Sequence, residues 1–191
     1  FWIKIAVAEI GPFTLVALRV TLATVAIWAC VLVQKIPLSA PTKEIGLMAL
    51  LGITNLALPF TLISWGETRI DSGLTGLLTA TMPLFTTLIA HCFIANDRIT
   101  VPKTIGVVLG FSGVGILFIR DLGPGEISFN LWGQAAVIGA ALCYASSTVY
   151  NRRFLQGQHP IAITAFALPF AAATMWLLAP LVEAPFTLPR L

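Results

Sequence analysis

Residues 12–41 read PFTLVALRVTLATVAIWACVLVQKIPLSAP, and residues 160–189 read PIAITAFALPFAAATMWLLAPLVEAPFTLP. At one constant offset, identical residues coincide at six positions: Pro12 with Pro160, Ala17 with Ala165, Ala23 with Ala171, Trp28 with Trp176, Pro37 with Pro185 and Pro41 with Pro189. The proline and tryptophan matches carry most weight, because alanine and leucine match by chance in an apolar chain. We therefore interpret the two segments as copies of one repeat.

The composition around these copies is that of a membrane protein. Hydrophobic residues make up 58% of the 191 residues and charged residues 10%, against the roughly 25% charged residues of soluble domains. The mean hydropathy is +0.93. Four long stretches contain no Asp, Glu, Lys or Arg: 45–66, 72–96, 127–151 and 154–182. Each reaches the length of about 20 residues that a helix needs to cross the hydrocarbon core. The alternation of polar and apolar residues that is typical of a membrane β-barrel does not occur in them.

The sequence therefore predicts an all-α, polytopic helical membrane protein. We expect a partial span that ends near Ala8, followed by spans at about 12–34, 45–66, 72–95, 104–119, 131–151 and 161–182. The chain begins at Phe1 without an initiator Met, so we expect it to be a fragment of about seven spans.

The loop charges predict how the spans are oriented. Alternating the loops between two sides places six basic residues on one side and three on the other; the first group is Lys35, Lys43, Arg98, Lys103, Arg152 and Arg153, and the second is Arg69, Arg120 and Arg190. The positive-inside rule makes the first side and the amino terminus cytoplasmic. Because five spans separate Pro12 from Pro160, the repeat is inverted, an arrangement typical of transporters.

Three prolines fall inside the expected spans, namely Pro59, Pro83 and Pro169. Each lacks an amide hydrogen, so the carbonyl four residues earlier must find another partner. Those earlier residues are Asn55, Thr79 and Ala165, of which the first two are polar. Two interpretations remain open: ordinary kinks with local hydrogen bonding, or helix breaks beside a substrate cavity at intermediate membrane depth.

Polar residues also recur at helical spacing in two spans. Tyr144, Ser147, Thr148 and Asn151 form a stripe that either faces a cavity or bonds between helices, and Thr79 lies near Thr81 in the fourth span. In the fifth span, the glycines at 106, 110 and 113 share a face that we expect to pack against another helix.

Arg19 lies roughly 10 Å into its span at 1.5 Å per residue. An ionisable side chain at that depth either snorkels to the interface or contacts substrate. No Asp or Glu lies in the middle of any span, so the sequence offers no obvious proton-carrying carboxylate.

The absence of known catalytic and nucleotide-binding motifs argues against several classes of protein. There is no HExxH, GxSxG or P-loop sequence, and Cys30, Cys92 and Cys143 are far apart. We therefore expect neither an enzyme nor a cofactor, metal or nucleic-acid partner. A membrane-embedded enzyme and a non-transporting scaffold remain as alternatives to a transporter.

The motifs resemble a known family. Residues 64–67 (SWGE), 81–85 (TMPLF), 97–100 (DRIT) and the glycines that follow resemble the end of an EamA-type repeat in the drug/metabolite transporter superfamily. The resemblance implies ten helices in two inverted repeats, here residues 1–126 and a truncated 127–191. It also implies alternating-access transport of small metabolites, such as amino acids, across a bacterial inner membrane, with a homodimer possible. Our substrate-cavity candidates, chosen from depth and polarity, are Asn55, Trp65, Thr79, Thr81 and Tyr144.

Overall fold

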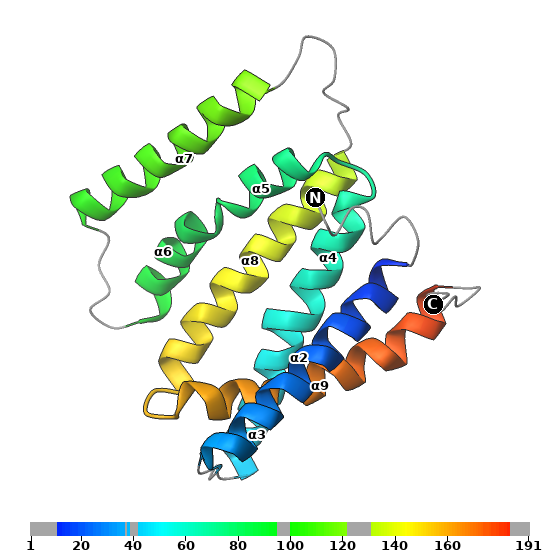
Figure 1. The fold of residues 1–191 in the computed structure, drawn as a ribbon. Coiled ribbons are helices and arrows are strands. Elements are labelled where there is room, and N and C mark those ends of the chain that lie inside the picture. Colours follow the sequence, from blue (N-terminus) through cyan, green and yellow to red (C-terminus); the bar gives the residue numbers. More distant parts are fainter. Residues whose placement is uncertain (1–10, 37, 39–41, 95–99, 122–130, 184–191) are drawn as a thin grey trace.

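The computed structural model describes residues 11–36, 38, 42–94, 100–121 and 131–183, and every regular element in these ranges is helical. The elements are α2 (Pro12–Gln34), α3 (Thr42–Gly52), the π-helix η1 (Ile53–Ala57), α4 (Leu58–Glu67), α5 (Ser72–Thr79), α6 (Met82–Phe93), α7 (Val101–Asp121), α8 (Leu131–Phe154) and α9 (Pro160–Val182) (Figure 1). The predicted all-α membrane fold is confirmed. The partial span near Ala8 and the loop between the expected repeats lie outside the described residues.

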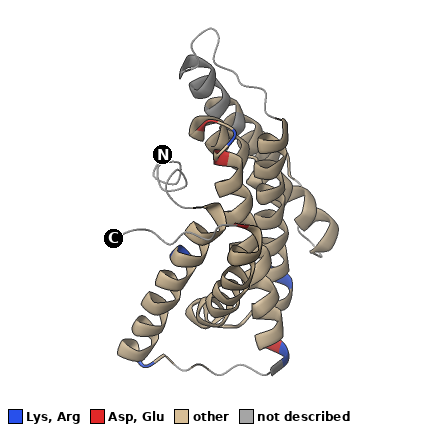
Figure 2. Ribbon diagram, turned by 90° about the vertical axis from the view of Figure 1, so that its right-hand side faces the viewer, with Lys and Arg blue, Asp and Glu red and all other residues tan. Residues whose placement is uncertain are grey.

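Four helical segments are long and apolar enough to cross a membrane, counted over the described ranges only: Pro12–Gln34, Lys43–Glu67, Ser72–Phe93 and Pro160–Val182. They match the predicted spans closely. Figure 2 shows most charged residues near helix ends, as expected where helix middles meet hydrocarbon. The 24-residue α8 is less apolar than these four, although it is long enough to span.

The lower apolarity of α8 follows from its position in the bundle. It packs against α4 on one side and against α5 and α6 on the other, so protein rather than lipid covers much of its surface. Small residues make these contacts close: Ala136, Ala140, Ala141 and Ala145 are buried. A side chain on Gly66 of α4 would meet Val137 of α8.

The predicted repeat partners α2 and α9 lie side by side and run antiparallel (Figure 1). Their shared core contains Val16, Val20, Leu168, Ala171 and Met175. The Glu183 carboxylate, at the end of α9, accepts hydrogen bonds from Phe13 N at 2.5 Å, Thr14 N at 3.0 Å and the Thr14 hydroxyl. The start of α2 therefore lies beside the end of α9. We call this the Gly11 side of the bundle, and the side where α2 ends the Lys35 side.

Two tryptophans join α2 and α9 reciprocally. Trp28 of α2 donates from Nε1 to the carbonyl of Ala165 at 3.0 Å, and Trp176 of α9 donates to Thr21 Oγ1 at 2.9 Å. The Ala165 carbonyl is the one that Pro169 leaves without its intrahelical donor. Of our two interpretations of the prolines, the helix break does not occur at Pro169, since α9 is continuous through it and the indole of Trp28 replaces the missing bond.

The glycine face of α7 has no close neighbour among the described residues. A Cβ built on Gly106, Gly110 or Gly113 would meet nothing within 4 Å. The expected close packing of this face against another helix therefore does not occur within the described part of the chain. Among the described elements, α7 makes its main contact with α5.

Candidate functional site

Two of the membrane-spanning segments change helix type at a proline. In the first, η1 precedes Pro59, and the amide of Leu58 donates to the carbonyl of Ile53, five residues earlier. A π-turn of this kind accommodates a residue that lacks an amide hydrogen, and π-bulges are frequent at functional sites. Asn55 lies within η1 and is half-buried. Its side chain makes no hydrogen bond with any residue that the structure describes.

The second interruption separates α5 from α6, directly before Pro83. Thr81 N donates to the carbonyl of Leu78 at 3.1 Å, and Leu84 N donates to that of Thr81 at 3.0 Å, so the chain tightens into a turn there. The hydroxyls of the two predicted threonines bond back to their own helix, Thr79 to Thr75 O at 2.7 Å and Thr81 to Leu78 O at 2.6 Å. Local bonding, which the sequence left open as one explanation, accounts for both hydroxyls.

Both interruptions lie near the middle of their spans. The 11 residues of α3 separate η1 from the Lys35 side, and the 12 residues of α6 separate the second interruption from the same side. At 1.5 Å per residue these lengths are about 17 Å, more than half of a hydrocarbon core about 30 Å thick. α8 packs against η1 and against both α5 and α6, so it lies between the segments that contain the two interruptions.

Two residues of the polar stripe of α8 make hydrogen bonds through their hydroxyls, one to another helix and one within α8. The Ser147 hydroxyl donates to Thr54 Oγ1 of η1 at 3.1 Å, which ties the π-helix to α8. The Thr148 hydroxyl bonds back to the carbonyl of Tyr144 at 2.8 Å. Interhelical and local hydrogen bonds thus account for two of the four residues in the stripe.

Three helices bring together a group that we call the aromatic–cation cluster: Arg19 of α2, Phe60 of α4 and Tyr144 of α8. The guanidinium carbon of Arg19 lies 5.2 Å from the centroid of the Phe60 ring. The Phe60 and Tyr144 rings meet edge to face, with centroids 6.3 Å apart. Of the five predicted cavity residues only Tyr144 belongs to this cluster, and Phe60 was not among the predicted residues.

Trp65 lies elsewhere, near the end of α4 on the Gly11 side. The guanidinium carbon of Arg69 lies over the Trp65 ring, 3.7 Å from the ring centroid. Two residues beside it in the SWGE motif are buried: Ser64 is 0% and Glu67 5% exposed. Neither residue was among the predicted cavity residues, although a polar residue within an apolar helix is the signal that could have identified them.

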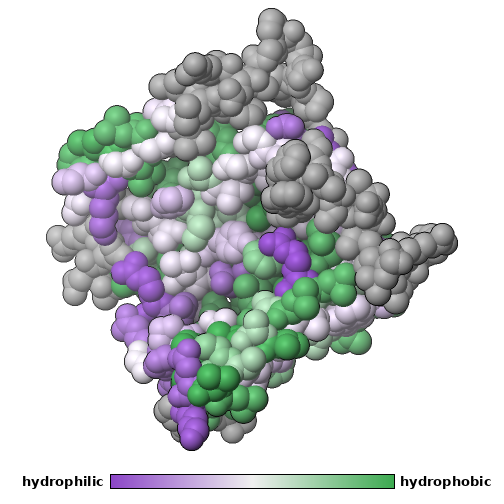
Figure 3. Space-filling model, in the orientation of Figure 1, coloured by the Kyte–Doolittle hydropathy of each residue, from purple (hydrophilic) through white to green (hydrophobic). Residues whose placement is uncertain are grey.

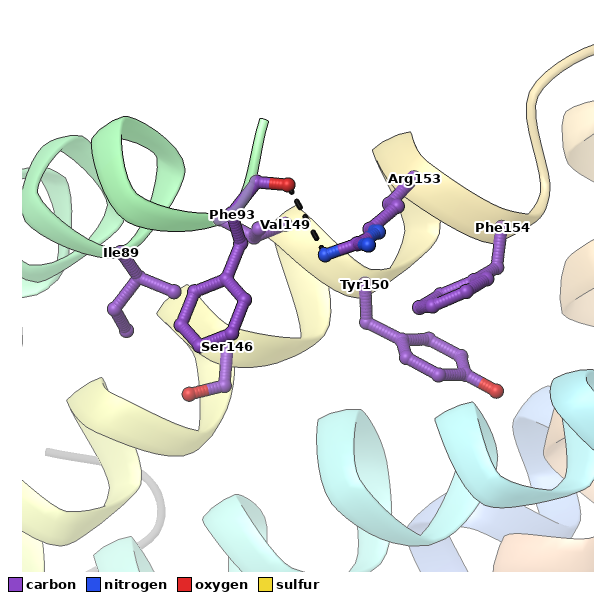
Figure 4. Close-up of a pocket in the computed structure, with 7 residues that line it drawn as sticks. All are labelled: Ile89, Phe93, Ser146, Val149, Tyr150, Arg153 and Phe154. Atoms are coloured by element: carbon purple, nitrogen blue, oxygen red, sulfur yellow. Dashed lines mark hydrogen bonds between the residues drawn. The ribbon is translucent and has the colours of Figure 1, made fainter. Parts of the chain in front are cut away.

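A cavity of about 410 Å³ lies between α6 and α8 toward the Lys35 side (Figure 4). Figure 4 shows the Phe93, Tyr150 and Phe154 rings around it, and the dashed line marks the hydrogen bond from Arg153 to the Phe93 carbonyl, 3.2 Å long. Its volume falls in the usual range of small-molecule pockets, about 300–1,000 Å³. The lining of this pocket comes from two spans that are distant in sequence, so local sequence patterns did not predict it.

A second cavity of about 390 Å³ lies between α6, α7 and α8. Lys103 and Arg152 line it together with Thr86 and Thr87. No group of three or more His, Cys, Asp or Glu residues that could hold a metal ion occurs in the described ranges.

Several known proteins are similar to this chain. The model of the EamA-like transporter family matches residues 1–119. The uncharacterized transporter YoaV of Bacillus subtilis is 28% identical over 82% of this chain and 52% of its own length. The uncharacterized inner membrane transporter YedA of Escherichia coli K12 is 26% identical over 91% of this chain and 54% of its own length. The chain thus spans about half the length of these curated relatives.

A further relative and a solved structure also resemble this chain. A probable terminal-alkyne amino-acid exporter of Streptantibioticus cattleyicolor is 26% identical over 58% of this chain and 37% of its own length. A solved crystal structure superposes with a TM-score of 0.74 at 22% identity, covering 98% of this chain and 67% of the solved one. At that identity the match shows a shared fold and nothing more.

Proposed function

Since this chain belongs to the EamA-like transporter family, we propose that it forms part of a secondary transporter that moves a small organic metabolite across a membrane by alternating access. One structural observation carries the proposal most directly: two spans are interrupted near mid-membrane, on either side of α8. Irregular backbone at that depth is tolerated where it is buried in protein or lines a cavity.

The interruptions suggest how the protein would move. Helix segments that meet at a π-turn or a tight turn can change their relative angle with little loss of hydrogen bonding. In our proposal, the α3–α4 and α5–α6 segments hinge at these points while α8 stays between them. Asn55 supplies a free amide to the substrate, and Tyr144 contributes an aromatic wall.

The chemical class and the direction of transport belong to the same proposal. We propose a metabolite related to amino acids, supported by one relative, a probable terminal-alkyne amino-acid exporter, and by the family resemblance. We further propose that the Lys35 side faces the cytoplasm of a bacterial cell, because six of the nine assigned loop cations fall on it.

Uptake by proteoliposomes that contain the complete protein tests the proposal. Asn55→Leu keeps the approximate size of the side chain but removes its amide, so we expect transport to fall at least about tenfold, the effect of losing about 1.4 kcal/mol of binding. The variant should still fold, which its monodispersity in detergent would show.

The matched control is Thr164→Val. Thr164 is exposed near the start of α9, and its hydroxyl bonds back to Pro160 O at 3.0 Å, as Thr79 does to Thr75. We expect Thr164→Val to transport normally and Thr79→Val to be slower, because Thr79 ends α5 at the second interruption, where we propose that the span hinges. Normal rates in a variant with both Asn55 and Thr79 replaced would contradict the proposed role of the interruptions.

A further inference from the structure

The guanidinium of Arg19 stays at membrane depth and does not reach the interface. Arg19 lies seven residues after the start of α2, and Phe60, whose ring it contacts, lies seven residues before the end of α4. Both helix ends are on the Gly11 side, so both residues are roughly 10 Å from it at 1.5 Å per residue. A snorkelling arginine would extend away from the membrane centre toward that side, whereas this side chain extends sideways to a ring at its own depth.

Arg19 has no acidic partner within the described part of the chain. Its recorded contact is the cation–π interaction with Phe60, which uses the positive charge but none of the five N–H donors of the guanidinium. The Glu183 carboxylate, beside the start of α2, already accepts hydrogen bonds from the amides of Phe13 and Thr14. A cation with free donors at this depth is costly unless an acceptor is present.

The side chain is also accessible. Arg19 is exposed, while Phe60 and Tyr144 are partly exposed beside it. The three residues come from α2, α4 and α8 and therefore border a common surface between these helices. Figure 3 shows mostly pale and purple atoms across the middle of the viewer's face of the molecule and green atoms along the α2 edge. A ligand could thus approach the guanidinium without first displacing a protein group.

We propose that Arg19 binds a carboxylate of the transported compound, with the Phe60 and Tyr144 rings against the apolar part next to that carboxylate. The inference rests on the proposed transport function and adds to it a substrate class, organic acids and zwitterions that carry a free carboxylate. A planar guanidinium offers two parallel N–H bonds to such a group, and these charge-assisted bonds discriminate against a neutral amide of the same shape.

The test uses the complete protein in proteoliposomes and a panel of the common L-amino acids, phenylacetate and the matching carboxamides. The wild type should take up one or more acids and none of their amides. Arg19→Gln should raise the KM for each transported acid about tenfold to hundredfold, the effect of losing charge-assisted hydrogen bonds. Arg19→Lys keeps the charge without the planar fork, so its KM should lie between those of the other two proteins.

The chain provides a matched control in Arg69. Its guanidinium also stacks on an aromatic ring, that of Trp65, but at the end of α4 rather than inside the span. Arg69→Gln should leave the KM unchanged. An unchanged KM in Arg19→Gln, or equal uptake of acids and amides by the wild type, would overturn the carboxylate site while transport stands. A wild type that moves no compound of the panel would overturn both proposals.

Discussion

The carbonyl of Ala165 illustrates how one side chain compensates for a proline in a neighbouring helix. Pro169 cannot donate to it, yet α9 continues without interruption because Trp28 donates from α2. At the matching place in α2, Thr21 occupies the position of Pro169 and its hydroxyl donates to Ala17 O at 2.7 Å; Trp176 bonds to that hydroxyl. A tryptophan of one helix thus reaches the matching position of the other in both cases, directly at Ala165 and through the Thr21 hydroxyl in α2, but only the Ala165 carbonyl lacks its own amide donor.

This difference predicts unequal effects of two matched substitutions. Trp28→Phe leaves the Ala165 carbonyl without a donor and should destabilise the protein by about 1–3 kcal/mol. Trp176→Phe should cost less, since the Thr21 hydroxyl keeps its bond to Ala17 O. Thermal unfolding of the complete protein in detergent would measure both. Equal losses of unfolding temperature would show that the Ala165 carbonyl does not depend on Trp28.

At the scale of helices, close backbone contact limits what α3 and α9 can accommodate. Gly52 ends α3, and a Cβ placed on it would overlap the backbone carbonyl of Ala167 in α9. A backbone atom cannot rotate away as a side chain can, so relief would require the two helices to separate. Gly46, in the same helix, has nothing within 4 Å of its Cβ position.

Alanine at these two glycines should therefore give opposite results. Gly46→Ala should stabilise the protein slightly, by up to about 1 kcal/mol, because alanine is the better helix former. Gly52→Ala should destabilise it by about 1–3 kcal/mol, the usual range for overpacking. Unfolding temperatures of the two variants provide the measurement. Similar behaviour of both would contradict the close approach of α3 and α9.

At the scale of the whole molecule, the antiparallel α2–α9 pair places one predicted repeat against the start of the other. The Glu183 carboxylate links the two at the Gly11 side, and a core of buried aliphatic residues links them along their length. The interrupted spans lie beyond this pair, on both sides of α8. The closely packed α2–α9 pair thus lies outside the two segments that we propose to hinge.

The orientation of the bundle gives a prediction at this scale. In a variant without Cys30, Cys92 and Cys143, a cysteine at exposed Thr68 lies on the Gly11 side and one at exposed Lys43 on the Lys35 side. A membrane-impermeant maleimide added to intact cells should label Thr68→Cys and spare Lys43→Cys. Labelling of Lys43→Cys alone would reverse the orientation that the loop charges predict.

Much of the fold could be predicted from the chain alone. The spans at 12–34, 45–66, 72–95, 131–151 and 161–182 agree with the helices to within a few residues, because the about 20-residue length of a span is a local property of the sequence. Pro59 and Pro83 likewise predicted changes of helix type, because a missing amide hydrogen removes a hydrogen bond from the turn in which the proline lies. Tyr144 was predicted from its position in a polar stripe.

Which helices become neighbours was decided only by tertiary structure. Hydropathy and proline positions do not predict that α8 lies between the interrupted spans. They also do not predict that Trp28 bonds to Ala165 or that Arg19 contacts Phe60. Those contacts join residues up to 137 positions apart and depend on how small side chains let helices approach. The sequence by itself determined where the chain crosses the membrane and where its helices weaken, because both are local effects. The aromatic–cation cluster and the compensation of Pro169 arise only when separate helices pack together.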